Sequence, residues 1–247
     1  MFDFMDVPRA YRAARDAYRF ACPERFNFAY DVIDRRGREA DKLAVLAVDG
    51  PSGVVRELAY SDLARRSSRL AGGLAALGLR AGDFACLVAG RIPEWYDAIF
   101  ACMKLGVVSL PGTNLLTGKD IAYRVNRTGA RAVIVSPEHC GKVEAVRADC
   151  PSLAHLIVIG GSRPGWVSTE ELAAGQPDGI DPARRPDLRS DDMMMGYFTS
   201  GTTAMPKMVP RDYAYGLAHA STGLFWMDLR PDDIHWTLTD TGWAKAA

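Results

Sequence analysis

The sequence lacks long hydrophobic runs and has no excess of charge of either sign. No segment approaches the roughly 18 uninterrupted apolar residues typical of a transmembrane helix, so we expect no membrane span. Thirty basic side chains balance thirty acidic ones, which removes the electrostatic argument for nucleic acid or an anionic membrane as the main partner.

The N-terminal residues also lack the features of a secretion signal. MFDFMD is acidic where a signal peptide is basic, and no apolar run follows it. Arginines at positions 9, 12, 15 and 19 resemble those of an organellar transit peptide, but aspartates at positions 3, 6 and 16 argue against one. We therefore expect a cytoplasmic protein.

Cysteine and histidine are few and widely spaced. The five cysteines and four histidines form no C-x-x-C pair and no cluster with the spacing of metal ligands. We expect buried free thiols in a reducing cytosol, and no metal site built from the residues of this chain.

The hydrophobic pattern predicts an α/β fold. Hydrophobic residues make up 48% of the 247 positions, which is enough for a sizeable core. Short apolar runs predict strands at 43–48, 54–60, 84–90, 107–111, 131–135, 155–159 and 193–198. Amphipathic stretches between them predict helices capped by Ser61 and Thr117, others from Pro93 and over 138–148, and one near Asp212. This alternation is typical of a parallel, doubly wound sheet.

The segment YFTSGTTAMPKMV, from Tyr197 to Val209, carries the strongest chemical signal. It combines several hydroxyls, a flexible glycine and a lysine directly after an apolar run. Backbone N–H groups on a glycine-permitted bend, hydroxyl donors and a mobile cation suit the binding of a polyphosphate. The spacing differs from a Walker A loop, which needs G-x-x-x-x-G-K-[ST]. An ordinary surface loop is the alternative.

This segment resembles the phosphate loop of the adenylate-forming superfamily, [ST]-[SG]-G-[ST]-[ST]-G-x-P-K, except that Ala204 replaces the second glycine. RIPEW (91–95), the stretch 104–125 and DTGW (240–243) resemble the medium-chain acyl-CoA synthetase branch. If Ala204 needs a positive φ, its methyl group costs about 1 kcal/mol. We expect the loop still to bind ATP.

The resemblance implies an acid–thiol ligase that activates a medium-chain carboxylic acid as acyl-AMP and transfers it to CoA. ATP is then a co-substrate, and Mg²⁺ is required but has its ligand outside this chain. Lys207 and Thr202 are the candidate catalytic residues. The implied phosphate-binding set is Thr199, Ser200, Gly201, Thr202, Thr203, Ala204 and Lys207. The implied acyl-binding set is Asp240, Thr241, Gly242 and Trp243, with Trp243 as a pocket wall.

The resemblance also implies a truncated domain. Residues 1–42 form a helical lead-in and residues 43–247 part of an AMP-binding domain, without its C-terminal part or the small mobile domain. We expect the chain alone to be poorly active or inactive. Two alternatives remain: a non-catalytic nucleotide-binding or interaction protein of the same fold, and an unrelated phosphotransferase with a Ser/Thr-rich loop.

Overall fold

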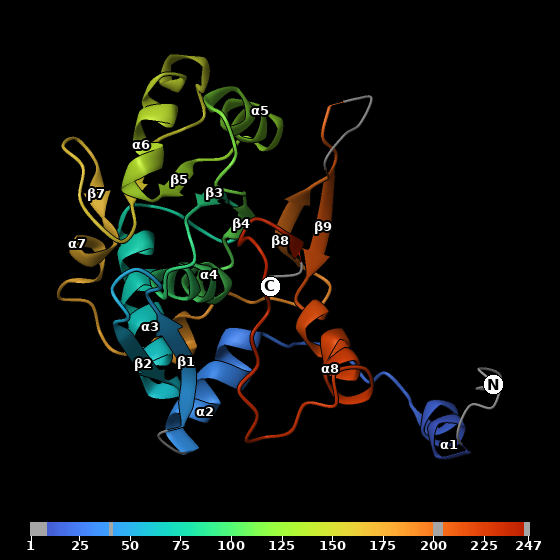
Figure 1. The fold of residues 1–247 in the computed structure, drawn as a ribbon. Helices are drawn as coiled ribbons and strands as arrows, with labels where there is room; N and C mark the ends of the chain where they lie inside the picture. The colour runs from blue at the N-terminus through green and yellow to red at the C-terminus, as the bar shows by residue number, and fades with distance from the viewer. Residues whose placement is uncertain (1–8, 40–41, 200–204, 245–247) are drawn as a thin grey trace.

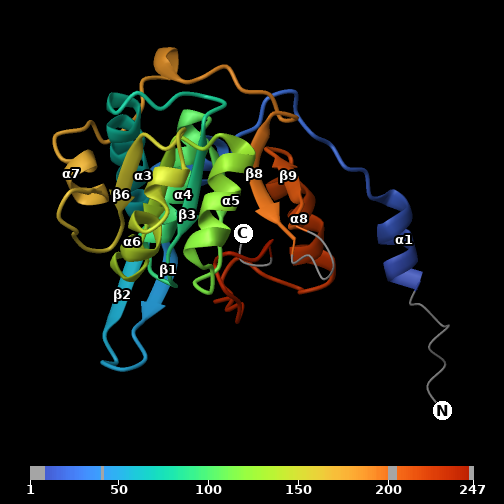
Figure 2. The same cartoon turned by 90° about the horizontal axis from the view of Figure 1, so that it is seen from above.

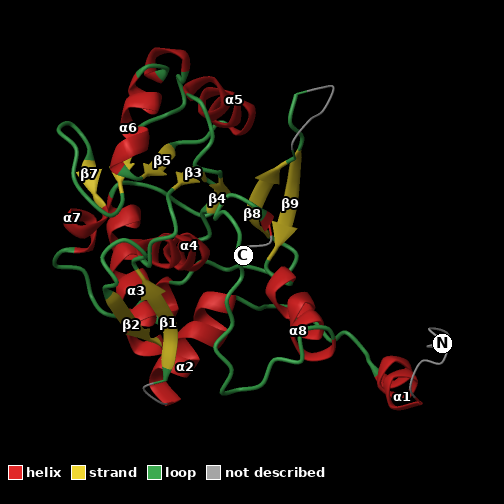
Figure 3. Ribbon diagram, viewed as in Figure 1, coloured by secondary structure: helices red, strands yellow, loops and turns green. Residues whose placement is uncertain are grey.

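A seven-stranded sheet forms the centre of the computed structural model, which describes residues 9–39, 42–199 and 205–244 (Figures 1 and 3). The strand order is β7-β6-β5-β3-β4-β8-β9, and every neighbouring pair is parallel except β8 and β9. The strands are β3 (Phe84–Val88), β4 (Val108–Pro111), β5 (Ala132–Val135), β6 (His155–Val158), β7 (Val167–Ser168), β8 (Met193–Phe198) and β9 (Met208–Asp212).

Helices cover both faces of this sheet, as a doubly wound fold requires. α3 (Tyr60–Ala76) and α4 (Glu94–Leu105) lie on one face, and α5 (Gly118–Thr128) and α6 (Pro137–Glu144) on the other (Figures 1 and 2). Side chains of β3 alternate between the two cores: Leu87 packs with α3 and α4, whereas Val88 packs with α5 and α6. The predicted α/β fold class is confirmed.

The remaining elements lie around this centre. A separate two-stranded antiparallel hairpin consists of β1 (Leu43–Val48) and β2 (Val55–Ala59), as expected from the sequence. Within residues 9–39 the chain forms α1 (Arg9–Ala17), the π-helix η1 (Ala29–Asp34) and α2 (Arg35–Glu39). α7 (Thr169–Ala173) follows β7, and α8 (Tyr215–Phe225) follows β9. Short 3₁₀ helices occupy Arg147–Asp149 and Pro182–Arg184.

The two predicted helix caps have different outcomes. Thr117 caps α5 as expected: its Oγ1 accepts from the Asp120 N–H, and the Asp120 carboxylate accepts from the Thr117 N–H at 2.8 Å. Ser61 does not cap α3, which already begins at Tyr60. The Asp62 carboxylate accepts the Ala59 N–H at 3.1 Å, so the side chain after Ser61 fixes the helix start.

The helix expected to start near Asp212 is α8, but the chain first forms a strand that was not predicted. This strand, β9, runs antiparallel to β8 and pairs Phe198 with Met208. Pro210 argues against a strand in the sequence, because proline cannot donate to a ladder. β9 is the outermost strand of its sheet, where a missing donor is tolerated, and α8 begins only at Tyr215.

The five cysteines are free, as expected, and Cys86, Cys102, Cys140 and Cys150 are buried. The expectation of burial is wrong for Cys22, which is exposed. Among the described residues, no helix is both long and apolar enough to cross a bilayer.

The carboxyl end of α4 connects three parts of the chain. The Met103 carbonyl accepts from Asn27 Nδ2 at 2.8 Å and from the Tyr213 hydroxyl at 2.9 Å. The Lys104 carbonyl accepts from the Tyr30 hydroxyl at 2.9 Å. These side chains supply donors to carbonyls at the helix end, where the Met103 carbonyl also accepts the Gly106 N–H at 3.4 Å. The segment before η1 and the residue after β9 are thereby attached to the central layer.

The Lys104 side chain is fully buried at the same place. Its Nζ lies 2.6 Å from Asp34 Oδ1 and also donates to the Ala64 carbonyl and the Ser68 hydroxyl. Burial lowers the pKa of Lys104, and the Asp34 carboxylate opposes that change. All three donor positions of the ammonium group therefore have acceptors.

Asp97 of α4 is the second buried charge on this face, with 6% of its surface exposed. Its Oδ2 accepts from Arg66 at 2.9 Å and 2.6 Å, whereas Oδ1 has no hydrogen-bond partner among the described residues. Burial raises the pKa of Asp97 to about 7; Arg66 opposes the rise, and the nearby Glu94 and Glu170 add to it. A cavity of about 140 Å³ lies beside this network, between α3, α4 and α7.

We expect Asp97→Asn to reduce the loss of stability that accompanies a pH increase from about 4 to 7. The folded chain retains a proton on Asp97 that the unfolded chain releases, so the free energy of unfolding falls with pH in this window, by at most about 1.4 kcal/mol per pH unit. Urea unfolding at several pH values measures the slope. Asp178→Asn, which removes an exposed partner of Arg69, is the control. Equal slopes in wild type and Asp97→Asn would contradict the prediction.

Candidate functional site

The hairpin between β8 and β9 presents the two described ends of the predicted phosphate loop. The Thr199 N–H donates to the Lys207 carbonyl at 2.9 Å, and the Lys207 N–H donates to Thr199 Oγ1 at 3.3 Å. Both side chains are exposed. The candidate residues Ser200, Gly201, Thr202, Thr203 and Ala204 lie outside the described residues, so the φ of Ala204 stays a question for experiment.

The order of the strands places a topological switch point beside this hairpin. After β3 the chain adds β4 on one side and then returns to add β5 on the other. In open α/β sheets, ligands bind at the carboxyl ends of strands where the order reverses in this way. β4 and β8 are parallel, with Ser109 opposite Met195, so the end of β4 and the start of the hairpin at Thr199 lie at the same sheet edge.

The predicted acyl-binding turn packs directly onto the switch point. Thr241 is 8% exposed, and its hydroxyl donates to the Ala89 carbonyl just after β3 at 2.6 Å. A Cβ added to Gly242 would lie 2.0 Å from the Thr113 nitrogen and 2.1 Å from the Gly112 carbon, just after β4. Only glycine permits this approach, so the turn sits on the ends of both strands.

The other two residues of the turn are less enclosed. Asp240 Oδ1 accepts the Gly242 N–H at 2.9 Å and thereby stabilises the turn itself. Trp243 is 56% exposed. Arg91 donates from Nε to the Thr239 carbonyl at 2.8 Å and supports the chain leading into the turn. Arg91 is therefore bound to this segment, while Glu94 pairs with Arg56 and Arg66.

A polar group that the sequence analysis did not single out lies near the same edge. His139, in the first turn of α6, is 4% exposed, and its Nε2 lies 2.9 Å from Asn114 Oδ1. Burial lowers the pKa of His139; Lys142 adds to this change, whereas Glu138 and Asp240 oppose it. The imidazole is thus neutral near pH 7. His139 and Asn114 are distant in sequence and match no spacing rule, so only the fold brings them together.

We expect Gly242→Ala to weaken the attachment of the turn by about 1–3 kcal/mol, because the methyl group would overlap backbone atoms that have little room to move. The readout is the exchange protection of amides around 240–243, with urea unfolding as the global measure. Gly50→Ala is the matched control, since nothing lies within 4 Å of a Cβ at that position. If both variants behave like wild type, the close packing of the turn is wrong.

Comparison with known proteins places this architecture in a family. The model of the family described as "AMP-binding enzyme" matches residues 34–246. Mitochondrial acyl-coenzyme A synthetase ACSM5 of Mus musculus is 40% identical over 234 residues, which cover 91% of this chain and 40% of the relative. Mitochondrial acyl-coenzyme A synthetase ACSM3 of Mus musculus is 36% identical over 246 residues, covering 96% of this chain and 42% of the relative. The chain thus spans less than half of the length of these relatives.

The expected cytoplasmic location is wrong by this comparison, because these relatives are named as mitochondrial proteins. The N-terminal segment carries both kinds of signal, arginines and aspartates. Arg12 and Arg15 are exposed on α1, which extends away from the central layers (Figure 2).

Solved structures of the same fold agree with the family match. An acyl-CoA synthetase of Brucella canis superimposes with a TM-score of 0.82 at 26% identity, covering 95% of this chain and 44% of that one. The anthranilate CoA ligase AuaEII, solved with anthranoyl-AMP, gives a TM-score of 0.72 at 26% identity, covering 83% of this chain and 38% of that one. With a family model matched over most of its length, the chain belongs to the AMP-binding enzyme family.

Proposed function

We propose that this chain is the N-terminal part of an ATP-dependent acyl-CoA synthetase that activates a medium-chain carboxylic acid as acyl-AMP and transfers it to CoA. The observation that carries the proposal is the position of two motifs at one sheet edge. The hairpin with Thr199 and Lys207 and the turn at 240–243 both lie at the carboxyl ends of the parallel strands. Family membership supports the same conclusion.

The reaction brings two anions together, a carboxylate and the α-phosphate of ATP, and it releases pyrophosphate. It needs no nucleophile from the protein, so positive charge and positioning lower the barrier. Lys207 supplies an exposed cation, and the hydroxyl of Thr199 lies beside its backbone. In this proposal, Ser200, Gly201, Thr202 and Thr203 add backbone and hydroxyl donors to the phosphates, with Thr202 and Lys207 in the catalytic roles.

The donors in the loop suit phosphate oxygens and do not suit a metal ion. Residues 199–207 contain hydroxyls, a lysine and no carboxylate, whereas Mg²⁺ prefers carboxylate and phosphate oxygens. We therefore place the protein ligand of Mg²⁺ outside this chain and assign no reaction step to the metal. Residues of this chain would hold the phosphates to which such an ion binds.

Asp240, Thr241, Gly242 and Trp243 form the acyl side of the proposed site. The hydrogen bond from Thr241 and the close approach of Gly242 fix the turn at the switch point, so that Trp243 projects from a defined backbone. Trp243 is largely exposed, and it serves as a pocket wall only once further polypeptide covers its other face. The anthranilate CoA ligase neighbour was solved with an acyl-adenylate of the kind expected here.

The second candidate function is a non-catalytic nucleotide-binding or interaction protein of the same fold. The unrelated phosphotransferase is not retained, because the family match accounts for the loop.

We expect Lys207→Ala to weaken ATP binding by the 247-residue chain about tenfold or more, since a charge-assisted contact to phosphate contributes roughly 1.5–3 kcal/mol. Isothermal titration with ATP measures the dissociation constant. Lys119→Ala removes an exposed lysine from the start of α5 and serves as the control. Equal affinities for the two variants would refute the phosphate role of Lys207.

We expect the 247-residue chain alone to catalyse little or no carboxylate-dependent exchange between ATP and pyrophosphate. The physical reason is that the proposed ligand of Mg²⁺ and the cover of Trp243 are contributed by other polypeptide. Incubation with octanoate, ATP and labelled pyrophosphate tests this, with a full-length synthetase as the positive control. Robust exchange by the chain would overturn the expectation and also remove the non-catalytic alternative.

A further inference from the structure

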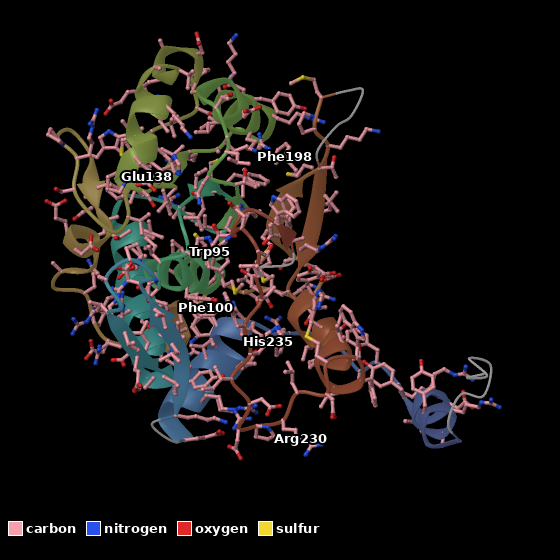
Figure 4. The ribbon with its side chains drawn as sticks, in the orientation of Figure 1. Trp95, Phe100, Glu138, Phe198, Arg230 and His235 are labelled. Atoms are coloured by element: carbon pink, nitrogen blue, oxygen red, sulfur yellow. The ribbon has the colours of Figure 1, made fainter. Side chains whose placement is uncertain are left out.

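α5 contacts the phosphate-loop hairpin next to its loop, although the phosphate-loop motif itself includes no residue of this helix. The Tyr123 hydroxyl donates to the Pro206 carbonyl at 2.9 Å. The Tyr123 ring also meets the Phe198 ring edge-on, with the centroids 6.0 Å apart. Figure 4 shows Phe198 between α5 and the two strands of the hairpin. One side chain therefore contacts the end of β8 and the loop segment just before β9.

Arg124 adds a second contact from the same helix. Its guanidinium lies 5.0 Å from the centroid of the Phe198 ring, a cation–π geometry, and the residue is 8% exposed. Its Nη1 donates to the Asp120 carbonyl at 2.9 Å, which fixes the side chain along α5. The Nε atom has no hydrogen-bond partner among the described residues. Phe198 is thus held by two consecutive residues of α5.

These contacts fall immediately next to the pair that closes the loop. Phe198 precedes Thr199, and Pro206 precedes Lys207, so each side of the loop is held one residue before a candidate phosphate ligand. The Pro206 carbonyl points to α5 and not to the neighbouring strand, because it accepts from Tyr123. A shift of Tyr123 would therefore move the backbone from which the Lys207 side chain projects.

α5 itself is firmly attached, which a positioning role requires. Ile121 and Val125 are 1% and 0% exposed, in the core between α5 and the sheet. Thr117 and Asp120 cap the start of the helix reciprocally. Tyr123 therefore extends from a rigid element, while the hairpin has β9 as an outer strand and depends on outside support.

We propose that Tyr123, assisted by Arg124, is a positioning residue that holds the phosphate-loop hairpin so that Thr199 and Lys207 face the phosphates together. The expected effect of Tyr123 on nucleotide binding rests on the proposed function, whereas its expected effect on the hairpin backbone does not. Tyr123 touches no substrate in this assignment and acts through the Pro206 carbonyl and the Phe198 ring.

We expect Tyr123→Phe to speed amide hydrogen exchange at Thr199 and Lys207 about three- to tenfold, the size expected for one neutral hydrogen bond. The measurement is residue-resolved exchange in the 247-residue chain without ligand. The dissociation constant for ATP should rise by a similar factor. Arg124→Met should affect the same two amides, because it removes the cation–π contact with Phe198.

Tyr30→Phe is the matched control, because it removes another tyrosine hydroxyl bonded to a backbone carbonyl at 2.9 Å, at the end of α4. It should leave exchange at Thr199 and Lys207 unchanged. Equal exchange at these amides in Tyr123→Phe and Tyr30→Phe would overturn the proposal, since the effect would then be general stability. If wild type binds no ATP but Tyr123→Phe still speeds local exchange, the hold on the hairpin stands and the proposed function fails.

Discussion

The ammonium group of Lys104 has no contact with solvent. The N-terminal segment is joined to the central layer through the groups that compensate this buried positive charge. Asp34 of η1, the Ala64 carbonyl and the Ser68 hydroxyl surround it, so the charge links η1, α3 and α4. Removing one partner of such a buried pair typically costs about 3–5 kcal/mol, because the remaining charge stays buried and unpaired. The pair therefore specifies one arrangement of these helices more than it adds net stability.

The same end of α4 also reaches the candidate site. Tyr213 directly follows β9, the second strand of the phosphate-loop hairpin, and its hydroxyl donates to the Met103 carbonyl. The hairpin is thus fixed near its base by the end of α4 and near its loop by Tyr123 of α5. These anchors lie in the cores on opposite faces of the sheet. The exposed loop can then carry charge and hydroxyls, because its strands are supported from both layers.

The sequence predicts this fold where signals are local and strong. Thr117 with Asp120 marks the start of α5, and buried apolar runs mark the parallel strands, because hydrogen bonding and burial act over a few residues there. β9 could not be predicted, because Pro210 is acceptable only in an outermost strand and the sequence does not show which strand is outermost. Ser61 failed as a cap because α3 already begins at Tyr60, which places Ser61 inside the first turn.

The candidate site shows the same contrast between local signals, which the sequence reveals, and long-range contacts, which it does not. Thr199, Lys207 and the turn at 240–243 were found from motifs, and the structure brings them to one sheet edge. No role was predicted for Tyr123, Asn114 or His139, although the first two lie in the stretch 104–125, because their contacts join distant segments. The exposure of Trp243 could not be predicted either, because the sequence motif contains the aromatic residue but does not show which residues cover it.

The hydrogen bond from Thr241 to the Ala89 carbonyl joins positions 152 residues apart. During synthesis the ends of β3 and β4 therefore exist long before the turn that covers them. Contacts of such large sequence separation form slowly, because a long loop must close before they contribute. The switch point stays open on the nascent chain until the glycine at position 242 emerges and docks. Assembly of this end of the sheet is thus a late step of folding, set by the order of the chain.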